Sequence, residues 1–479
     1  MNIDKLKGKV LQLAIQGKLV PQNEEDIPAS VLLEEIIKEK EQLVKEKKIK
    51  KEKPLQEITE EEKLFKLPNG WEWCRLGTVG YTNIGLTYKP KDVGNDGTPV
   101  LRSTNIQNGK IDLNDLVRVQ VDIPENKMCE IGDILICARN GSKRLVGKCA
   151  IIKETGMSFG AFMAIYRSKY NEYINIILNS EFFKKQLGDS NTVTINQITQ
   201  SMLKNIVCPL PPLEEQKRIV EKVEGLFSII DNLNKNKEEM LKNISNTRNK
   251  VLQLAIQGKL VEQNENDTPA SVLLEEIKKE KEELMKEKKI KKEKALPEIT
   301  EEEKFFELPK GWGWCKLGEI GYTNIGLTYN PKDIVEVGIP VLRSTNIQNS
   351  KIDLNDLVCV QTDIPENKMC KIGDILICAR NGSKHLVGKC AIIKENGMSF
   401  GAFMAIYRSK YNEYINIILN SELFKKQLGD SNTVTIKQIT QTMLRNIVCP
   451  LPPLEEQKRI VSKVDEIMDY LDELEKVIL

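Results

Sequence analysis

Apolar residues in the middle of the chain recur at alternating intervals of four and three positions, within a segment that is otherwise rich in charge. The series comprises Ile219, Val223, Leu226, Ile230 and Leu233. Such spacing places one apolar seam along a helix, as in a short heptad repeat. The string PPLEEQKRIV precedes it, and both its prolines and its glutamates favour a helix start. The pattern predicts one long helix from about residue 213 to residue 258.

The same alternation returns near the end of the chain, at Ile460, Val464, Ile467, Leu471, Leu474 and Ile478. Two further helices, rich in lysine and glutamate, are predicted from about 30 to 53 and from about 271 to 294. Between residues 38 and 53 there are eight lysines and four glutamates. This mixture is typical of an exposed helix with opposite charges one turn apart. We expect these two helices to face solvent or a partner rather than DNA.

A different pattern, of short β-rich runs between turn residues, occupies residues 63–210. The string IGDILICARNGS followed by VGKCAII predicts a strand, a turn and a second strand, and its Asn-Gly pair favours a tight turn. Apolar spacing within 168–187 predicts a helix. The segment is therefore expected to form a mixed α/β globule.

The chain is a tandem duplication. The string VLQLAIQGKLV begins at Val10 and again at Val251, an offset of 241 positions, and residues 71–220 align with 312–461 without a gap and with 20 differences. Two near-copies of one globule are expected. The resulting division is a helical segment at 1–62, a globule at 63–210, a helical spacer at 211–303, a second globule at 304–451 and a C-terminal helix at 452–479.

The helical segments at the two ends of the chain together repeat the central spacer. Under the same offset, Leu479 falls just before the position that aligns with Met1, so the two ends rebuild the spacer almost completely. We expect an α+β protein in which two repeated mixed α/β domains are separated by long antiparallel coiled-coil helices. The expected arrangement is pseudo-cyclic, with a pseudo-two-fold axis, the globules at opposite ends of the helices and the termini close together.

Charge is divided unevenly between the two kinds of segment. The whole chain has 71 basic and 69 acidic side chains, a net charge of +2. Residues 63–210 have 19 basic and 13 acidic side chains and residues 304–451 have 18 and 13, so the globules are net +6 and +5 and the remainder is −9. A basic globule is what contact with a phosphate backbone requires.

Composition argues against several other classes of protein. No apolar run approaches the roughly 18 residues that a membrane span needs, and the N-terminal string MNIDKLKGKV lacks the apolar core of a signal peptide. The eleven cysteines include no CxxC pair and are expected to be free thiols in a reducing compartment. We therefore expect a cytoplasmic protein without membrane contact.

No catalytic or metal-binding residue is predicted. The single histidine, His385, is matched by Arg144 in the other copy, which disfavours a catalytic role in a duplicated domain. The cysteines lack partner histidines at ligand spacing. The string GSKRLVGK has five residues between its glycines, where a phosphate-binding loop has four, and it precedes a strand, so it predicts a hairpin. No dinucleotide-binding fingerprint and no Asn/Asp-Pro-Pro-aromatic motif of amino-methyltransferases occurs.

One recurring string has a more specific meaning. PLPPLEEQKRIV, at 209–220 and 450–461, opens a helix in both copies and follows ITQSMLKNIV or ITQTMLRNIV. Each copy also contains, in order, a Gly-Trp string, PVLRSTNI, and IGDILICARNGS with VGKCAII. In these strings the chain resembles the specificity subunit of type I restriction-modification systems, over nearly its whole length.

The resemblance implies a division of labour. In that family, antiparallel helices hold apart two target-recognition domains, here 63–210 and 304–451, and each domain reads one half of a bipartite double-stranded DNA sequence. The helices dock two modification subunits, which use S-adenosylmethionine to methylate adenine, and a restriction subunit can add ATP-driven translocation and cleavage. The chain itself would be a non-catalytic subunit that binds no cofactor, with S-adenosylmethionine on the partner. Because the two domains are nearly identical, an interrupted-palindromic target is expected.

Candidate DNA contacts are polar or basic residues of predicted loops, because arginine and lysine hydrogen-bond guanine edges while asparagine and glutamine suit adenine. In the first copy they are Tyr88, Lys89, Arg102, Ser103, Thr104, Asn105, Arg139, Asn140, Ser142, Lys143 and Arg144. In the second copy they are Tyr329, Arg343, Ser344, Thr345, Asn346, Arg380, Asn381, Ser383 and Lys384. For each of them, contact with phosphate is expected more often than base readout.

Two other functional classes remain open on the sequence alone. One is a coiled-coil adaptor with two identical protein-binding modules, which leaves the basic bias of the globules unexplained. The other is an enzyme whose site matches no familiar motif, which would need a constellation of titratable groups repeated in both copies.

Overall fold

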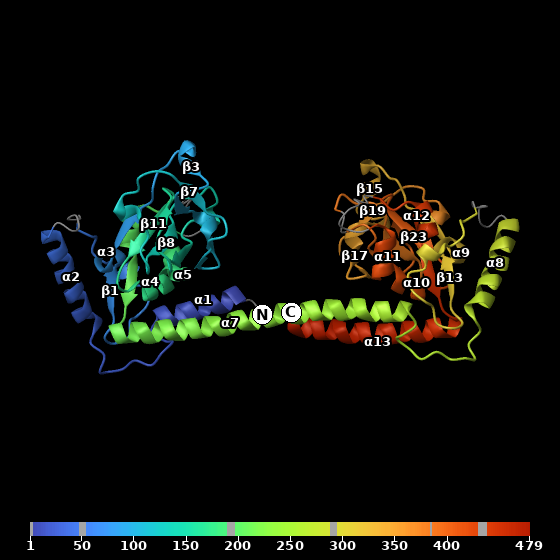
Figure 1. The fold of residues 1–479 in the computed structure, drawn as a ribbon, viewed down its shortest axis with the longest axis horizontal. Coiled ribbons are helices and arrows are strands. Elements are labelled where there is room, and N and C mark those ends of the chain that lie inside the picture. The colour runs from blue at the N-terminus through green and yellow to red at the C-terminus, as the bar shows by residue number, and fades with distance from the viewer. Residues whose placement is uncertain (1–2, 47–53, 189–196, 288–294, 384–385, 430–437) are drawn as a thin grey trace. The chain divides into compact units, whose positions relative to one another are not determined.

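The computed structural model describes residues 3–46, 54–188, 197–287, 295–383, 386–429 and 438–479. The chain folds into two compact units, Met1–Asn236 and Lys237–Leu479, and the boundary falls inside its longest helix, α7 (Leu213–Ile256). Figure 1 labels the elements of both. The five segments expected from the sequence thus form two units, because the helices pack on the globules.

The first unit contains, besides the first half of α7, the helices and strands α1 (Ile3–Ile15), α2 (Ala29–Lys45), β1 (Glu72–Arg75), α3 (Leu76–Val79), β2 (Tyr81–Ile84), β3 (Val93–Gly94), β4 (Thr98–Leu101), β5 (Ile106–Gln107), β6 (Lys110–Ile111), β7 (Val117–Val119), β8 (Ile134–Cys137), β9 (Cys149–Ile151), β10 (Ser158–Phe159), β11 (Met163–Arg167), α4 (Asn171–Leu178), α5 (Glu181–Gln186), α6 (Gln200–Asn205) and β12 (Val207–Leu210).

The second unit contains, besides the second half of α7, the elements α8 (Ala270–Lys286), β13 (Gly313–Lys316), α9 (Leu317–Ile320), β14 (Tyr322–Ile325), β15 (Ile334–Val335), β16 (Ile339–Leu342), β17 (Ile347–Gln348), β18 (Lys351–Ile352), β19 (Val358–Val360), β20 (Ile375–Cys378), β21 (Cys390–Ile392), β22 (Ser399–Phe400), β23 (Met404–Arg408), α10 (Asn412–Leu419), α11 (Glu422–Gln427), α12 (Gln441–Asn446), β24 (Val448–Leu451) and α13 (Leu454–Ile478).

The strand β8 forms the buried centre of the first unit. It lies between β11 and β9 in the antiparallel sheet β2–β11–β8–β9. Ile134 and Ile136 belong to a core shared with the helices, while Leu135 and Cys137 belong to a second core. Successive side chains point to opposite faces of a strand, so a strand covered on both faces needs a continuous apolar run. The strand predicted from ILIC is confirmed.

A second sheet, β10–β4–β7–β3, combines the parallel pair β10–β4 with antiparallel pairs. The second unit repeats both sheets, in the orders β14–β23–β20–β21 and β15–β19–β16–β22. The α+β class and the duplication of the mixed domain are therefore confirmed. In each unit a further antiparallel pair, β1–β12 or β13–β24, brings the beginning of the globule beside its end, where the next long helix starts.

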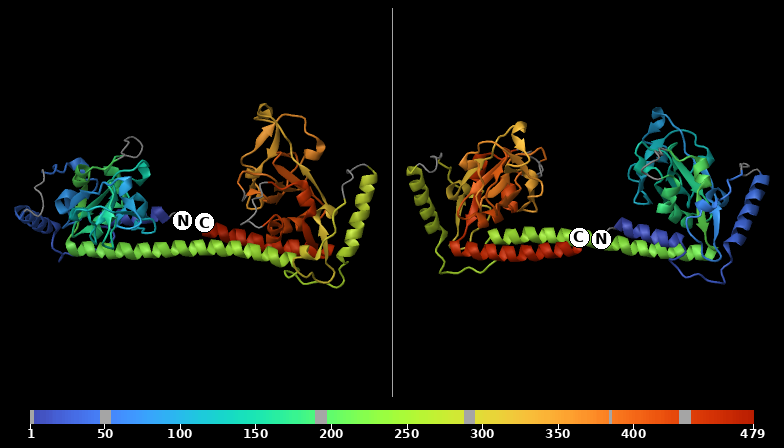
Figure 2. Two further views of the ribbon diagram at one scale, coloured as in Figure 1. Left: turned by 45° about the horizontal axis from the view of Figure 1, so that its top comes forward. Right: turned by 180° about the vertical axis from the view of Figure 1, so that it is seen from behind.

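In the first unit, α1 lies along the first half of α7 in the views of Figures 1 and 2. Lys7 of α1 pairs with Asp231 of α7 at 2.5 Å, and Asp26 further along the chain pairs with Arg218 at 2.6 Å. The N-terminal segment and α7 consequently run in opposite directions, as expected for antiparallel coiled-coil helices.

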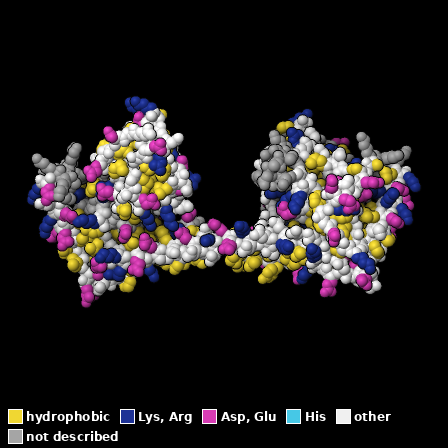
Figure 3. All heavy atoms as spheres, viewed as in Figure 1, with side chains coloured by type: hydrophobic (Ala, Val, Ile, Leu, Met, Phe, Trp, Pro, Cys, Tyr) yellow, Lys and Arg dark blue, Asp and Glu magenta, His cyan; other side chains and the backbone are white. Residues whose placement is uncertain are grey.

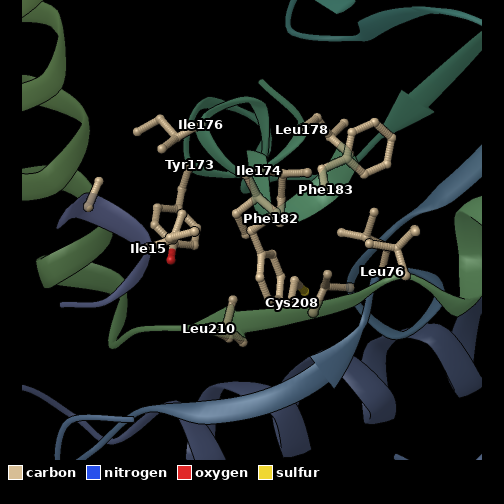
Figure 4. Packing of buried hydrophobic residues seen from close by; sticks show 14 of the residues in the cluster. Ile15, Leu76, Tyr173, Ile174, Ile176, Leu178, Phe182, Phe183, Cys208 and Leu210 are labelled. Carbon is tan, nitrogen blue, oxygen red and sulfur yellow. The ribbon is translucent and has the colours of Figure 1, made fainter. Parts of the chain in front are cut away.

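These helices share the core of the globule. Ile15 from α1, Tyr173 from α4 and Leu210 from β12 lie in one cluster with Phe182 and Cys208 (Figure 4). Separating helices from globule would expose this apolar surface to water, and its burial is the main favourable contribution to folding. Helices and globule therefore fold as one unit.

In the second unit, α13 packs antiparallel against the second half of α7. Arg248 of α7 forms ion pairs with Asp472 at 2.5 Å and with Glu475 at 2.7 Å. The predicted seam is buried at Ile460, Val464 and Leu471, and in the first unit at Ile219, Val223 and Ile230. One position is wrong: Leu233 is 47% exposed, because α1 begins just beyond the Lys7–Asp231 pair and offers little for Leu233 to pack against.

The motif PPLEEQ is held by buried hydrogen bonds as well as by its place at a helix start. Glu215 is 1% exposed, and its carboxylate accepts hydrogen bonds from Trp71 Nε1 at 2.9 Å and from Gln22 Nε2 at 3.0 Å. Burial raises the pKa of Glu215, and these two donors oppose that rise. Glu456 accepts from Trp312 in the same way at 2.9 Å. The motif thus joins the globule, α7 and the chain after α1.

Replacing this carboxylate should weaken the fold. Glu215→Ala is expected to lower the free energy of unfolding by about 1–3 kcal/mol, because two donors at the core lose their acceptor. The matched control is Glu214→Ala, whose carboxylate is exposed and pairs only with Lys217 among the described contacts; it should cost less than about 0.5 kcal/mol. Urea unfolding of the full chain measures both, and equal losses would contradict the assignment.

Two expectations differ from the structure, the unbroken helix at 168–187 and the tight turn after β8, and the lysine-rich helices are described only in part. The helix expected at 168–187 is interrupted: Ser180 Oγ accepts a hydrogen bond from Phe183 N at 3.4 Å and starts α5 as a separate helix. The lysine-rich helices are described as far as Lys45 and Lys286, and 47–53 and 288–294 lie outside the described residues. The strands β8 and β9 pair as predicted, but their connection is a wide loop at 138–148 rather than a tight Asn-Gly turn.

None of the described helices contains a stretch that is both long and apolar enough to cross a membrane.

Candidate nucleic-acid interface

Two loops that carry candidate residues meet in the first unit. Arg102 and Ser103 follow β4 directly, and Arg139 and Asn140 come after β8. Asn140 Nδ2 donates a hydrogen bond to Ser103 Oγ at 2.9 Å, which ties together loops whose strands belong to different sheets. The second unit repeats this bond at 2.9 Å between Asn381 and Ser344.

A third segment, the turn between β10 and β11, completes this surface. Phe162 is 62% exposed in that turn, and the Arg139 guanidinium lies over its ring at 5.6 Å from the centroid. The carbonyl oxygen of Phe162 accepts hydrogen bonds from Ala138 N and Arg139 N, both at 2.9 Å. The connection from β8 to β9 is closed separately, by hydrogen bonds from Cys137 N to Lys148 O at 2.8 Å and from Gly147 N to Cys137 O at 2.9 Å, so the Asn-Gly pair lies within a wide loop.

The segment with Tyr88 and Lys89 reaches the same surface from β2. Leu86 forms a parallel bridge with Gly160, and Tyr88 is half-buried. Lys89 is exposed, and its backbone N–H donates to Asp92 Oδ2 at 2.7 Å. In the second unit Tyr329 packs beside a small apolar cluster, but asparagine replaces lysine at the next position.

Arg102 is available for exchange rather than locked in place. Its guanidinium pairs with Asp115 at 3.2 Å, and the two side chains are 37% and 81% exposed. Arg343 repeats the pair with Asp356 at 3.1 Å. Exposed ion pairs contribute about 0–1 kcal/mol, so a DNA phosphate can replace the aspartate at little cost.

Asn105 and Asn346 are the clear corrections to the candidate set. Each is 1% exposed. Asn105 accepts from Arg102 N and donates to the carbonyl oxygens of Asp112 and Asp115, all at 2.9 Å. Asn346 repeats these bonds at 2.8–2.9 Å. The prediction that these two asparagines contact DNA is wrong, because their amides hold the backbone of the arginine loop.

The other candidates lie in the same loops at the surface. Thr104 and Thr345 are exposed, and the loop after β8 exposes Ser142, Lys143 and Arg144. In the second unit Ser383, the counterpart of Ser142, and Arg380, the counterpart of Arg139, are exposed as well. Ser142 N and Ser383 N donate to the side-chain oxygens of Asn140 and Asn381 at 2.9 Å, which orders the loop tips. Lys384 lies outside the described residues.

Phe162 and its counterpart Phe403 were not among the predicted contacts, although Phe403 is 60% exposed and Arg380 lies over its ring at 5.5 Å. Both occur in the string FGAFMAIYR, whose apolar character indicates a strand. The glycine and alanine before the second phenylalanine could have indicated this position. Small residues there allow a tight turn, which places the phenylalanine ring at the surface.

Positive and negative side chains are mixed on the face of the molecule drawn in Figure 3. On the face drawn in Figure 3, lysine and arginine side chains are interspersed with aspartate and glutamate, and a basic group lies at the tip of the first unit near β3. The net excess of the globules therefore does not mark one continuous patch on that face. On this face the loop arginines are local candidates for contact with phosphates or bases.

The described residues offer little for covalent chemistry. No group of three or more His, Cys, Asp or Glu side chains that could hold a metal ion occurs among them. The cysteines are free, and all but Cys359 are buried. Burial raises the pKa of the Cys149 and Cys390 thiols to about 12, so they are protonated at neutral pH and poor nucleophiles.

Comparison with known families gives one consistent result. The family described as "Type I restriction modification DNA specificity domain" matches residues 68–243 and again residues 309–479. The first match covers most of one globule and ends inside α7, and the second covers most of the other globule and all of α13.

Similar proteins of known name agree with this match. The specificity subunit of the type I restriction enzyme EcoAI from Escherichia coli is 31% identical, over 99% of this chain and 90% of its own length. That of EcoEI, also from Escherichia coli, is 30% identical over 98% and 90%. Among solved structures, the HsdS subunit from Thermoanaerobacter tengcongensis has a TM-score of 0.50 at 21% identity, over 87% of this chain and 94% of its own. A chain from a study of complex assembly and conformational transition in a type I R-M system has a TM-score of 0.60 at 21% identity, over 86% and 94%.

Proposed function

The chain belongs to the family of type I restriction-modification specificity subunits, whose role is DNA recognition, and we propose that each of its two globules reads one half of a bipartite target. The observation that carries this proposal is the duplicated surface formed by the loops after β4 and β8 and the turn before β11. It presents Arg102 and Arg139 in the first unit and Arg343 and Arg380 in the second. Arginine forms bidentate hydrogen bonds to guanine and contacts phosphates equally well.

The partners proposed for this chain are two modification subunits on its helices. Support comes from apolar side chains that the helices leave exposed, among them Ile229 (56%) and Met240 (46%) of α7 and Tyr470 (67%) of α13. Exposed apolar groups along a helix suit burial against a second protein. The names of the relatives, which are subunits of restriction enzymes, also support a restriction subunit as a further partner. The adaptor alternative gives no reason for a DNA-specificity match on both repeats.

Methyl transfer is assigned to the partner rather than to this chain. We propose that S-adenosylmethionine binds the modification subunit and that adenine is methylated there. Support for this division comes from the sequence, which contains no Asn/Asp-Pro-Pro-aromatic motif of amino-methyltransferases.

A reconstitution tests the assignment. The chain alone, with S-adenosylmethionine and DNA, is expected to transfer no methyl group above background. Addition of the modification subunit encoded with it should start transfer to adenine within a specific sequence. Incorporation of tritium from labelled S-adenosylmethionine into the DNA measures methyl transfer in both reactions. Transfer by the homogeneous chain alone would overturn the proposal, as would reconstituted transfer without sequence preference.

A further inference from the structure

We propose that Phe162 and Phe403 are specificity-determining residues, and that each ring contacts the C5 methyl group of a thymine beside the base pair that the stacked arginine reads. The inference rests on the proposed function, because it assumes that the surface around Arg139 and Arg380 faces DNA. It adds to that function an apolar base contact and a composition for each half-site.

The position of Phe162 is built rather than accidental. Met163 N donates to Gly160 O at 2.8 Å, which closes a turn with Phe162 at its tip, and two backbone donors after β8 hold the carbonyl oxygen of Phe162 at 2.9 Å. In the second unit Met404 N donates to Gly401 O at 2.8 Å and the same two donors hold Phe403 O at 2.9–3.0 Å. The backbone therefore fixes each ring outwards, in both copies.

Neither phenylalanine ring contributes to the hydrophobic cores of the described residues. Phe162 and Phe403 are 62% and 60% exposed, and neither belongs to a hydrophobic cluster of the described residues. Nearby Phe159, at the end of β10, is fully buried. A large apolar side chain gains nothing by facing water, whereas it gains by burial against an apolar group of a partner. In the major groove that apolar group is the thymine methyl.

The guanidinium over the ring sets the geometry of readout. Its carbon lies 5.6 Å from the Phe162 centroid and 5.5 Å from the Phe403 centroid. Cation–π attraction keeps the two groups together and restricts the arginine. Base pairs are about 3.4 Å apart along the helix axis. The guanidinium and the ring together therefore span one or two base-pair steps. Each half-site should therefore contain a guanine with a thymine one or two positions away.

The test uses the complex of this chain with its modification subunit and a duplex that carries its methylated sequence. Each thymine of the half-sites is replaced in turn by deoxyuridine, which lacks only the C5 methyl group. Each half-site should contain one thymine that is sensitive to this replacement. Replacing that single thymine is expected to weaken binding by the wild-type complex about fourfold, the loss expected for one buried methyl-sized group. That thymine should lie one or two steps from a guanine.

Variants then assign the effect to the ring. The double variant Phe162→Ala, Phe403→Ala should bind the thymine duplex about 16-fold more weakly, a fourfold loss in each half-site, and should no longer distinguish thymine from deoxyuridine. The matched control is Ile131→Ala, Ile372→Ala, which removes equally exposed apolar side chains (69% and 63%) from the turn before β8 or β20, at the far end of that strand from the arginine. The control should keep the discrimination.

The possible outcomes distinguish failure of the thymine contact from failure of the proposed DNA-recognition function. A wild-type complex that binds its target specifically but treats every thymine and deoxyuridine alike overturns the inference and leaves the DNA-recognition proposal intact. Discrimination that persists in the phenylalanine variant also overturns it. Binding without any sequence preference would instead contradict the proposed function. The wild-type comparison needs no variant, so a poorly folded substitution cannot obscure the result.

Discussion

Replacement of Arg139 and Arg380 together by alanine is expected to abolish most of the preference of the assembled complex for its target over random DNA. A bidentate arginine–guanine contact contributes about 1–3 kcal/mol of discrimination. Two such contacts, one in each half-site, correspond to a loss of about 30-fold to 10⁴-fold in the ratio of specific to non-specific affinity. Both guanidinium groups are exposed and held over a fixed ring, which is why these arginines are chosen.

Competition binding with the target duplex and a scrambled duplex measures this ratio. The matched control removes two exposed charges elsewhere on the same domains, through Lys184→Ala and Lys425→Ala on α5 and α11, where each lysine pairs with a neighbouring glutamate. That control should leave the ratio unchanged. If the arginine variant weakens target and scrambled DNA by the same factor, the two residues contact phosphate and the base-reading assignment is wrong.

Much of the architecture could be predicted because it rests on periodic patterns. The heptad spacing indicated the apolar seams of the long helices, and the ILIC run predicted the strand β8, which the structure covers on both faces. The motif PPLEEQ was predicted only as a helix start. Its second role, the bond from Trp71 to Glu215, joins residues 144 positions apart, and no local pattern records such a contact.

The candidate site was predicted less well, for two physical reasons. The string RSTN has the composition of a solvated loop, but Asn105 turns inwards and satisfies backbone groups that would otherwise be unpaired. Short polar side chains do this often, and the sequence does not distinguish the inward from the outward case. The outward position of Phe162 depends on hydrogen bonds between the turn and the loop after β8, which are contacts between distant segments.

The largest expected consequence of the duplication concerns the target itself. Two nearly identical domains related by a two-fold axis would meet the two DNA strands in equivalent ways. The target should then be an interrupted palindrome: a short half-site, an unread spacer and the reverse complement of the half-site. Domains that read one face of B-DNA favour half-site centres about one helical turn apart, roughly 10 base pairs.

The differences between the two copies fall mostly away from the proposed reading surface. The largest cluster replaces the string VGND at 93–96 with IVEV at 334–337. This loop precedes β4 and joins it to the edge strand β3, whereas Arg102 follows the other end of β4. Val337 is 89% exposed there. Arg144, which is replaced by His385, is exposed in the loop after β8, whereas His385 itself lies outside the described residues. Asn196 and its replacement Lys437 also lie outside them.

If any of these substitutions reached a base edge, one half-site would differ, and each mismatched base pair would cost about 1–3 kcal/mol. The strings RSTNIQN and ARNGSK are kept in both copies, so the account predicts equal halves. Replacing a differing segment of one copy by that of the other, for instance residues 93–96 by the sequence of 334–337, should leave the recognised DNA sequence unchanged.

Sequencing of methylated adenines in a genome that carries this chain with its modification subunit tests the central claim most directly. The account predicts one dominant motif, with two half-sites that are reverse complements across a fixed unread spacer and with a methylated adenine in each. A bipartite motif with unrelated halves would contradict it, and would show that the few substituted positions rather than the shared loops determine which bases are read.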